Sequence, residues 1–247
     1  MGNTKNKILN VVVDNVPVHK VLNVIKLAVE KKQRVSITYA TFNKINYAYS
    51  ENRFNRLLRK FDIVHPDGVG VFLASKFLYG NNGFIERMTG SDIYPPLIDT
   101  GLNKGWKFFF IGDTEDVLQE INYKVPRLKI VGKNSGYDFD TAKVIKAIDE
   151  SMPDILVVGV GSPRQEEWIV ANRRKINVSV IIAVGDGIKV FAGKKIRGGR
   201  FIQMMGLEWM IRLFLHPIKM WRRYILGIPL FIFRILFQKL KMVLDCD

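Results

Sequence analysis

The chain has 247 residues, 48% of them apolar, and a formal charge of +15 at pH 7. This apolar content excludes a disordered chain, and the length fits one large domain or one domain with an appendage. The single cysteine, Cys246, excludes an internal disulfide and suits a reducing cytosol. The polar start of the chain, Met1 to Lys7, precedes only a short apolar run, so no signal peptide is expected.

In chain order, short β-rich runs alternate with amphipathic helical patterns over the first 190 or so residues. Strands are expected over 35–38, 62–64, 106–111, 128–131, 155–158 and 178–184, and helices over 18–32, 42–60 (broken near 52), 69–78, 114–123, 141–151 and 163–175. This alternation predicts an α/β fold, a Rossmann-like parallel sheet covered by helices. It stops near Gly199, so we predict a core over 1–199 and an appendage over 200–247.

The appendage is expected to be helical, over 201–215, from Pro217 to about residue 226, and again from Pro229. The apolar run 225–233 is too short to cross a bilayer, which takes about 20 residues. Aromatic and basic residues alternate around Trp221, as at a lipid headgroup boundary. These features favour an amphipathic segment that binds the membrane; the alternative is a helical pair packed on its own core or on a second subunit.

Charge supports the same interpretation of the appendage. The residues from Lys194 onward carry a net +8, about half of the whole excess. Such a concentration predicts an anionic partner: a membrane surface, a pyrophosphate or a nucleic acid. Because the basic segment is also apolar and helical, a membrane fits it better than a nucleic acid.

A glycine turn lies between the apolar run 155–158 and a helical pattern. Gly159 and Gly161 would let backbone amides approach a phosphate at the start of the helix, where negative charge is favoured. Pro163 suits the first turn of that helix. The turn is therefore either half of a phosphate site or an ordinary corner of an α/β fold.

Asp67 is the acid–base candidate of the N-terminal half. It follows a predicted strand, is fixed between Pro66 and Gly68, and belongs at the sheet edge where open α/β folds bind ligands. Thr38 ends the preceding predicted strand and would lie near Asp67 if the strands are neighbours. The alternative for Asp67 is an Asp-Gly turn that caps a helix.

Two basic motifs are candidate anion sites. Arg87 opens the loop 87–92, which suits an oxyanion, although a plain salt bridge is the alternative. Arg212, Lys219 and Arg222 are expected to converge from two helices around Pro217 as a diphosphate clamp. A solvated basic face is the alternative there.

Neither a metal site nor a nucleophilic triad is predicted. The three histidines, His19, His65 and His216, are far apart, and no metal-ligand spacing appears. Asp138-Phe139-Asp140 lies in a polar loop with no apolar strand before it.

Taken together, these motifs resemble those of the WecG/TagA/CpsF family of bacterial glycosyltransferases. Their order and spacing match over nearly the whole chain: Thr38, Asp67-Gly68-Val69-Gly70, Arg87-Met88-Thr89-Gly90-Ser91-Asp92, Phe110-Ile111-Gly112, Gly159-Val160-Gly161-Ser162-Pro163-Arg164-Gln165-Glu166, Phe191-Ala192-Gly193-Lys194, Gly206-Leu207-Glu208-Trp209, Arg212, Pro217 and Arg222-Arg223-Tyr224.

The resemblance implies an inverting, metal-independent transfer of a sugar, N-acetylmannosamine or a related hexose. The donor would be a UDP-sugar and the acceptor a polyprenyl-diphosphate-linked sugar, in cell-surface polysaccharide synthesis. No cofactor is implied, the place of work is the cytoplasmic face of the bacterial inner membrane, and a homo-oligomer is allowed.

The resemblance also assigns roles to residues. Asp67 would be the general base, with Thr38, Arg87 and Gln165 lining the same pocket, and Arg212, Lys219 and Arg222 would contact the lipid diphosphate. The nucleotide-sugar would meet Gly112, Tyr137, Gly159, Gly161, Pro163, Glu167 and Asp186.

The chain departs from the family pattern in four places. The family's asparagine after the threonine is missing from 38–41, and 185–189 replaces Gly-Gly-Thr-Phe-Asp. Arg197-Gly198-Gly199 replaces Arg-Ala-Pro, and Lys219 stands where arginine is common. The first two changes fall on the sugar or nucleotide pocket.

Two other functions remain open from the sequence. One is a non-catalytic nucleotide- or phospholipid-binding module that uses the same basic surface. The other is a nucleotide-dependent oxidoreductase, which the lack of a GxGxxG motif after the first strand disfavours.

Overall fold

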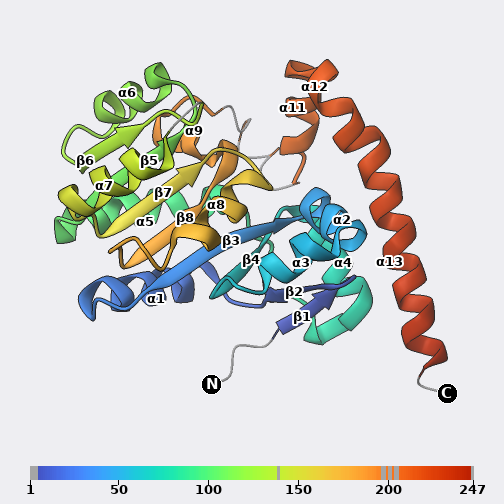
Figure 1. Cartoon of the computed structure of the whole chain (residues 1–247). Helices are drawn as coiled ribbons and strands as arrows, with labels where there is room; N and C mark the ends of the chain where they lie inside the picture. Colours follow the sequence, from blue (N-terminus) through green and yellow to red (C-terminus); the bar gives the residue numbers. More distant parts are fainter. Residues whose placement is uncertain (1–4, 138–139, 196–198, 200–201, 203–205, 246–247) are drawn as a thin grey trace.

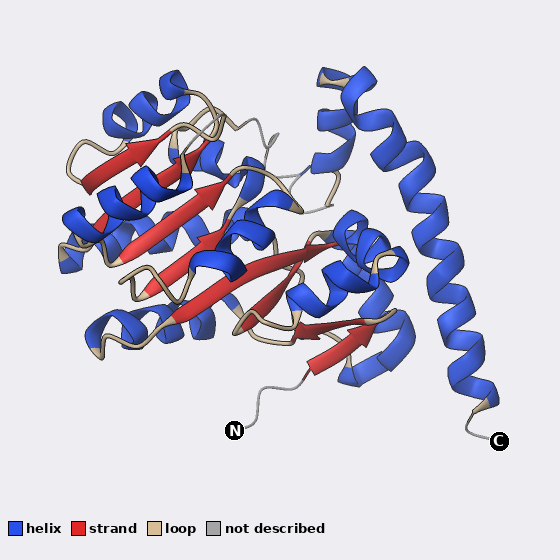
Figure 2. Ribbon diagram, in the orientation of Figure 1, coloured by secondary structure: helices blue, strands red, loops and turns tan. Residues whose placement is uncertain are grey.

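In the computed structural model, described over residues 5–137, 140–195, 199, 202 and 206–245, six parallel strands form one sheet. Helices cover both faces of this sheet (Figures 1 and 2). The strands run in the order β4-β3-β8-β7-β5-β6. Their bounds are β3 Val35–Thr41, β4 Ile63–Asp67, β5 Lys107–Gly112, β6 Lys129–Asn134, β7 Ile155–Gly159 and β8 Val180–Ala183. The predicted Rossmann-like α/β fold is confirmed.

Alternation along the strands divides the core into two layers. In β5, Phe108 and Phe110 point to one face, whereas Phe109 and Ile111 point to the other. The first face is covered by α1 Val18–Glu30, α5 Gly90–Lys104, α6 Glu115–Lys124 and α9 Ile188–Phe191. The second is covered by α2 Phe42–Ser50, α3 Asn52–Leu58, α4 Val69–Tyr79, α7 Thr141–Ser151 and α8 Arg164–Asn172.

The sequence did not predict the antiparallel hairpin of β1 (Lys5–Ile8) and β2 (Val11–Asp14). β1 has only one apolar residue, so its alternation is hidden. Asn6 is buried on the inner side and donates to the Asn82 carbonyl at 3.0 Å. A buried hydrogen-bonded amide thus takes the place of an apolar side chain.

Helix α5 was also missed, because it contains Pro95 and Pro96. A capping box starts it: Thr89 donates its backbone N–H and its hydroxyl to Asp92 Oδ2 at 2.9 and 2.8 Å. The predicted loop 87–92 is therefore partly the start of a helix.

From Glu208 onward the described tail has two helical parts, α11 (Glu208–Leu215) and a continuous helix from Pro217 to Leu244. The second part comprises α12 (Pro217–Trp221), a π-helical turn η3 (Arg222–Leu226) and α13 (Gly227–Leu244). Pro229 falls in the first turn of α13, close to where the third helix was expected to begin, although no gap separates α13 from η3. Residues 196–198, 200, 201 and 203–205 lie outside the described part, so the predicted boundary at 199/200 is described on one side only.

Helix α13 packs along the core beside α2 and α4 (Figure 1). Phe231 and Ile235 are buried in the core. Arg234 donates to the Asn46 carbonyl at 2.9 Å and to the Ser50 hydroxyl at 3.0 Å. Across the described residues, no helix combines the length and apolarity that a membrane span requires.

Candidate functional site

A cavity of about 1410 Å³ opens at the carboxyl ends of β3, β4, β7 and β8, beneath the tail helices. Its wall contains Asp67, Arg87, the glycine turn at Gly161 and the basic corner at Arg212 and Arg222. The structure therefore brings together motifs from both ends of the chain at the sheet edge where α/β folds bind ligands.

Asp67 is the last residue of β4 and is half-buried in this wall. Its Oδ1 accepts the N–H of Gly90 at 3.0 Å, at the start of α5. Gly68 follows with φ +92° and donates its N–H to the Met88 carbonyl at 2.9 Å. The aspartate is thus fixed by backbone groups, and the start of a helix favours its negative charge.

Thr38 lies elsewhere than predicted. The strand β3 continues to Thr41, which is the residue in register with Asp67, whereas Thr38 pairs with Val64. Thr38 is fully buried and is not part of the cavity wall. Its hydroxyl instead donates to Glu166 Oε1 at 3.0 Å.

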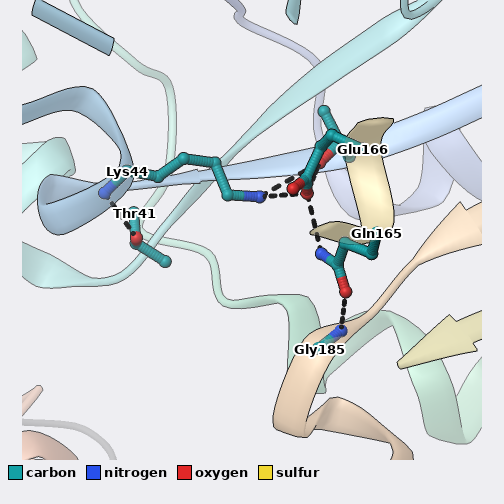
Figure 3. A network of polar contacts seen from close by, with 6 residues as sticks. Thr41, Lys44, Gln165, Glu166 and Gly185 are labelled. Atoms are coloured by element: carbon teal, nitrogen blue, oxygen red, sulfur yellow. Dashed lines mark hydrogen bonds and ion pairs between the residues drawn. The ribbon is translucent and has the colours of Figure 1, made fainter. Parts of the chain in front are cut away.

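That carboxylate is the centre of a buried polar network (Figure 3). Lys44 Nζ, from α2, donates to Glu166 Oε1 at 2.7 Å and to the Thr38 hydroxyl at 3.1 Å. Gln165 Nε2 donates to the same Glu166 oxygen at 2.7 Å, and Gln165 Oε1 accepts the Gly185 N–H at 2.9 Å. The network therefore joins α2, β3, α8 and the loop after β8.

The charge of Glu166 depends on Lys44. Burial alone would raise the pKa of Glu166, but the Lys44 ammonium, with hydrogen bonds from Lys44 and Gln165, lowers it below its usual value. Glu166 is therefore an anion that Lys44 neutralises. Through Gln165 this pair holds one side of the cavity wall in place.

A second lysine, Lys195, faces the other side of the cavity. Its Nζ donates to the Ser91 hydroxyl at 3.3 Å. Burial, with Arg212 nearby, lowers the pKa of Lys195 to about 8. Asp67 and Asp186 act in the opposite direction, and both line the same cavity as Lys195 and Arg212.

Two phenols complete the wall near Asp67. Tyr39 and Tyr94 both line the cavity, with their rings edge to face at 6.2 Å. Burial raises the pKa of both hydroxyls, so they stay protonated at neutral pH. Glycines make room for Tyr94: a Cβ on Gly187 would lie 2.5 Å from its hydroxyl.

The predicted nucleotide residues separate into two groups. Gly161, Pro163 and Asp186 line the cavity, next to Gln165. The others do not: Gly112 and Gly159 pair at the ends of β5 and β7, Tyr137 is exposed beyond β6, and Glu167 is exposed on α8.

Lys189 links the two groups. Its Nζ lies 3.4 Å from Asp186 Oδ1 and 3.5 Å from Asp113 Oδ2, which follows Gly112. Burial would lower the pKa of Lys189, but the two carboxylates raise it, so it stays charged. A ligand in the cavity near Asp186 would thus meet a wall that continues toward Gly112.

At the basic corner, Arg212 and Arg222 both line the cavity, and Arg223 lines it too. Lys219 lies in α12, but its side chain is outside the described part of the chain. Tyr224 holds the corner against the core, with ring centroids 5.6 Å from Trp209 and 6.0 Å from Phe42.

Sequence reasoning missed Lys44, Lys195, Arg223, Tyr39 and Tyr94. For Tyr39, Lys195 and Arg223 a signal existed, since each lies within or next to one of the family motifs, and Tyr94 lies two residues after another. Nothing in the pattern around Lys44 marks it as buried. Its partner Glu166 is 122 residues away.

Within the described ranges, no three His, Cys, Asp or Glu side chains are grouped to hold a metal ion. His65 is fully buried, Nε2 lies 3.1 Å from the Val16 carbonyl, and burial lowers its pKa, so its role is structural. Asp138 and Phe139 lie outside the described residues.

Comparison with known proteins identifies the family of the chain. The model of the glycosyl transferase WecG/TagA/CpsF family matches residues 6–243. An N-acetylglucosaminyldiphosphoundecaprenol N-acetyl-beta-D-mannosaminyltransferase of Bacillus spizizenii is 32% identical over 76% of this chain and 74% of its own length. Proteins with the same description are 31% identical in Bacillus subtilis, over 80% of this chain and 78% of their own, and 26% in Staphylococcus aureus, over 96% and 94%. The chain therefore belongs to the WecG/TagA/CpsF family and is a glycosyltransferase.

Proposed function

We propose that this enzyme transfers N-acetylmannosamine or a related hexose from a UDP-sugar to a sugar carried on polyprenyl diphosphate. The relatives' description supports the sugar and the acceptor. The observation that carries the proposal is the position of Asp67, fixed by backbone groups in a cavity that the cationic tail covers.

The proposed reaction is one displacement with inversion and without a metal ion. The acceptor hydroxyl oxygen attacks the anomeric carbon while Asp67 takes its proton, and the bond from that carbon to the UDP oxygen breaks. A single carboxylate is enough for this reaction. The acceptor hydroxyl attacks the sugar directly, so no second carboxylate is needed as a nucleophile. The phenols of Tyr39 and Tyr94 would donate hydrogen bonds beside Asp67.

The charge of the leaving UDP then needs stabilisation by the protein. The backbone at Gly161 and the nearby cations, Lys189 and Lys195, would supply it. Arg212 and Arg222 would hold the acceptor diphosphate by charge-assisted hydrogen bonds.

The enzyme would work at the cytoplasmic face of the membrane, held there by the tail. The exposed apolar side chains of α11 to α13, with arginines and lysines between them, support this part of the proposal.

Asp67→Asn tests the reaction. It keeps the shape but removes the base, so transfer should fall by about 10²- to 10⁴-fold while UDP binding persists. Transfer is measured by product analysis with a panel of UDP-sugars and a lipid-diphosphate-N-acetylglucosamine acceptor, and UDP binding by calorimetry. Asp99→Asn, at an exposed position on α5, is the matched control.

Wild-type rates in Asp67→Asn would refute the assignment of the base. UDP binding without transfer by the wild-type protein, for every donor tried, would instead support a non-catalytic nucleotide-binding module.

A further inference from the structure

The cavity does not end at the polar site. It continues between α4 and α13, where its wall changes from charged to apolar. Leu73 and Phe77 lie one turn apart on α4, and Ile232 and Leu236 lie one turn apart on α13. All four line the cavity and are about half exposed, although α13 packs against α4.

We call these four side chains the α4–α13 groove. Ile235 is buried behind Leu236 and forms part of the core on which the groove rests. At its far end Lys239 Nζ, from α13, donates to the Leu78 carbonyl of α4 at 3.1 Å. The groove is thus bounded by packing beneath and by a cross-helix hydrogen bond at one end.

Asp67 and the basic corner lie on the same side of the groove along α4 and along the tail helix. Asp67 precedes α4 directly, so Leu73 and Phe77 lie about 9 and 15 Å further along this direction. The basic corner at Arg222 likewise precedes α13 in the continuous tail helix. The base and the cationic corner thus both precede the apolar groove, as the sugar hydroxyl and the diphosphate both precede the hydrocarbon of the proposed acceptor.

We propose that the α4–α13 groove binds the first isoprene units of the acceptor's polyprenyl chain, next to the diphosphate. This inference rests on the proposed function for the identity of the acceptor. The groove is short, about 8 Å from Leu73 to Leu78, so the rest of the chain would remain in the lipid bilayer. Half-exposed apolar walls favour a hydrocarbon over water, because each covered side chain leaves the solvent.

The test compares two paired variants, Leu73→Ser/Phe77→Ser and Ile232→Ser/Leu236→Ser, in detergent solution without bilayers. Acceptors carry undecaprenyl, farnesyl or only a methyl group on the same diphospho-sugar. We expect both variants to raise the KM of the undecaprenyl and farnesyl acceptors at least about tenfold and to leave the methyl acceptor unchanged. Leu27→Ser/Tyr123→Ser, two exposed apolar positions outside the cavity wall, is the matched control.

A second readout does not depend on catalysis. Farnesyl diphosphate binding, followed by tryptophan fluorescence, should weaken in both groove variants, whereas inorganic pyrophosphate binding should not. If the wild-type protein transfers no sugar but the groove variants bind farnesyl diphosphate, and not pyrophosphate, more weakly, the proposed reaction is refuted and the proposed groove is supported.

Three results would overturn the inference. The first is an equal rise in KM for the methyl acceptor, which would indicate a distorted polar site. The second is unchanged binding of farnesyl acceptor and farnesyl diphosphate. The third is a dimer in sedimentation that the groove variants dissociate while farnesyl diphosphate binding persists, since a second copy would then occupy the groove.

Discussion

At the scale of single residues, Glu166 is a costly group to bury. It is fully buried, and one of its oxygens accepts hydrogen bonds from Thr38, Lys44 and Gln165. An isolated buried carboxylate would be strongly destabilising, so Lys44 is required as soon as Glu166 is ionised. Gln165 transmits this arrangement to Gly185 in the cavity wall.

Lys44→Met is expected to lower the unfolding free energy by about 3–5 kcal/mol at neutral pH, because it leaves an unpaired buried charge. In the wild type the lowered pKa of Glu166 gives stability that is lost as pH falls through that pKa. Without Lys44, burial raises the pKa, so protonation at falling pH favours the folded state. The stability gap between wild type and variant should therefore narrow in acid, as measured by urea unfolding.

The double variant Lys44→Met/Glu166→Gln separates charge from geometry. Its neutral amide can still accept from Thr38 and Gln165, so we expect most of the lost stability to return. Lys146→Met removes an exposed ammonium as a control. A double variant as unstable as Lys44→Met alone would contradict the charge argument.

The lowered pKa of Lys195 predicts that substrate binding depends on pH. With a pKa of about 8, its ammonium loses the proton as pH rises through 8, so kcat/KM should fall above that pH. Lys195→Arg should keep its charge and move this fall to higher pH, and Lys195→Gln should remove it. A profile of Lys195→Gln identical to the wild type would show that Lys195 does not face the substrate.

How far the sequence predicts the site differs from residue to residue. Asp67 and Gly161 were found because strand ends and glycine turns have local patterns. Thr38 was placed three residues too near the sheet edge, since β3 continues to Thr41. The lysine partners depend on contacts distant in sequence, such as Lys195 with Ser91, which no local pattern contains.

At the scale of elements, the close approach of β5 and β7 leaves no room for a side chain at Gly112. Gly112 has φ +144°, and a Cβ there would lie 2.6 Å from the Gly159 carbonyl carbon and oxygen. Gly161 has φ +85° but open space around it. The two glycines therefore share an unusual backbone and differ in crowding.

Gly112→Ala should lower the unfolding free energy by about 2–4 kcal/mol, from crowding together with backbone strain. Gly161→Ala, the matched control, should cost only the backbone part, about 1 kcal/mol. Thermal or urea unfolding measures both. Equal losses of unfolding free energy in the two variants would show that β5 and β7 move apart easily at Gly112.

The elements of the sheet were predictable because they alternate with amphipathic helices. The failures have local causes: a buried Asn6 hides β1, and two prolines disguise α5.

At the scale of the whole molecule, apolar and basic residues share the outer surface of the tail. Phe233, Phe237 and Leu240 are exposed on a face of α13 away from the cavity, and Lys241 Nζ lies 4.7 Å from the Phe237 ring centroid. Exposed apolar surface of this extent indicates an interaction site.

Phe233→Ser/Phe237→Ser should weaken binding to phosphatidylglycerol vesicles, measured by co-sedimentation. Binding by the wild-type protein should also fall as salt is raised, because cations screen its attraction to anionic lipid. Neutral phosphatidylcholine vesicles are the control. Equal binding to both kinds of vesicle at all salt concentrations would contradict the expectation that this face of the tail binds an anionic membrane.

The two hydrogen bonds of Gln238 affect how an experiment with a truncated form of this enzyme should be interpreted. Its amide accepts the Leu9 N–H at 2.7 Å and donates to the Lys7 carbonyl at 2.9 Å, so the last helix satisfies backbone groups of the first hairpin. A chain cut before the tail would leave the Leu9 N–H without this partner, although the Lys7 carbonyl would still accept the Tyr79 hydroxyl at 2.7 Å. Loss of activity in such a fragment would report a damaged amino terminus as much as a missing anchor, which makes point substitutions the cleaner tool.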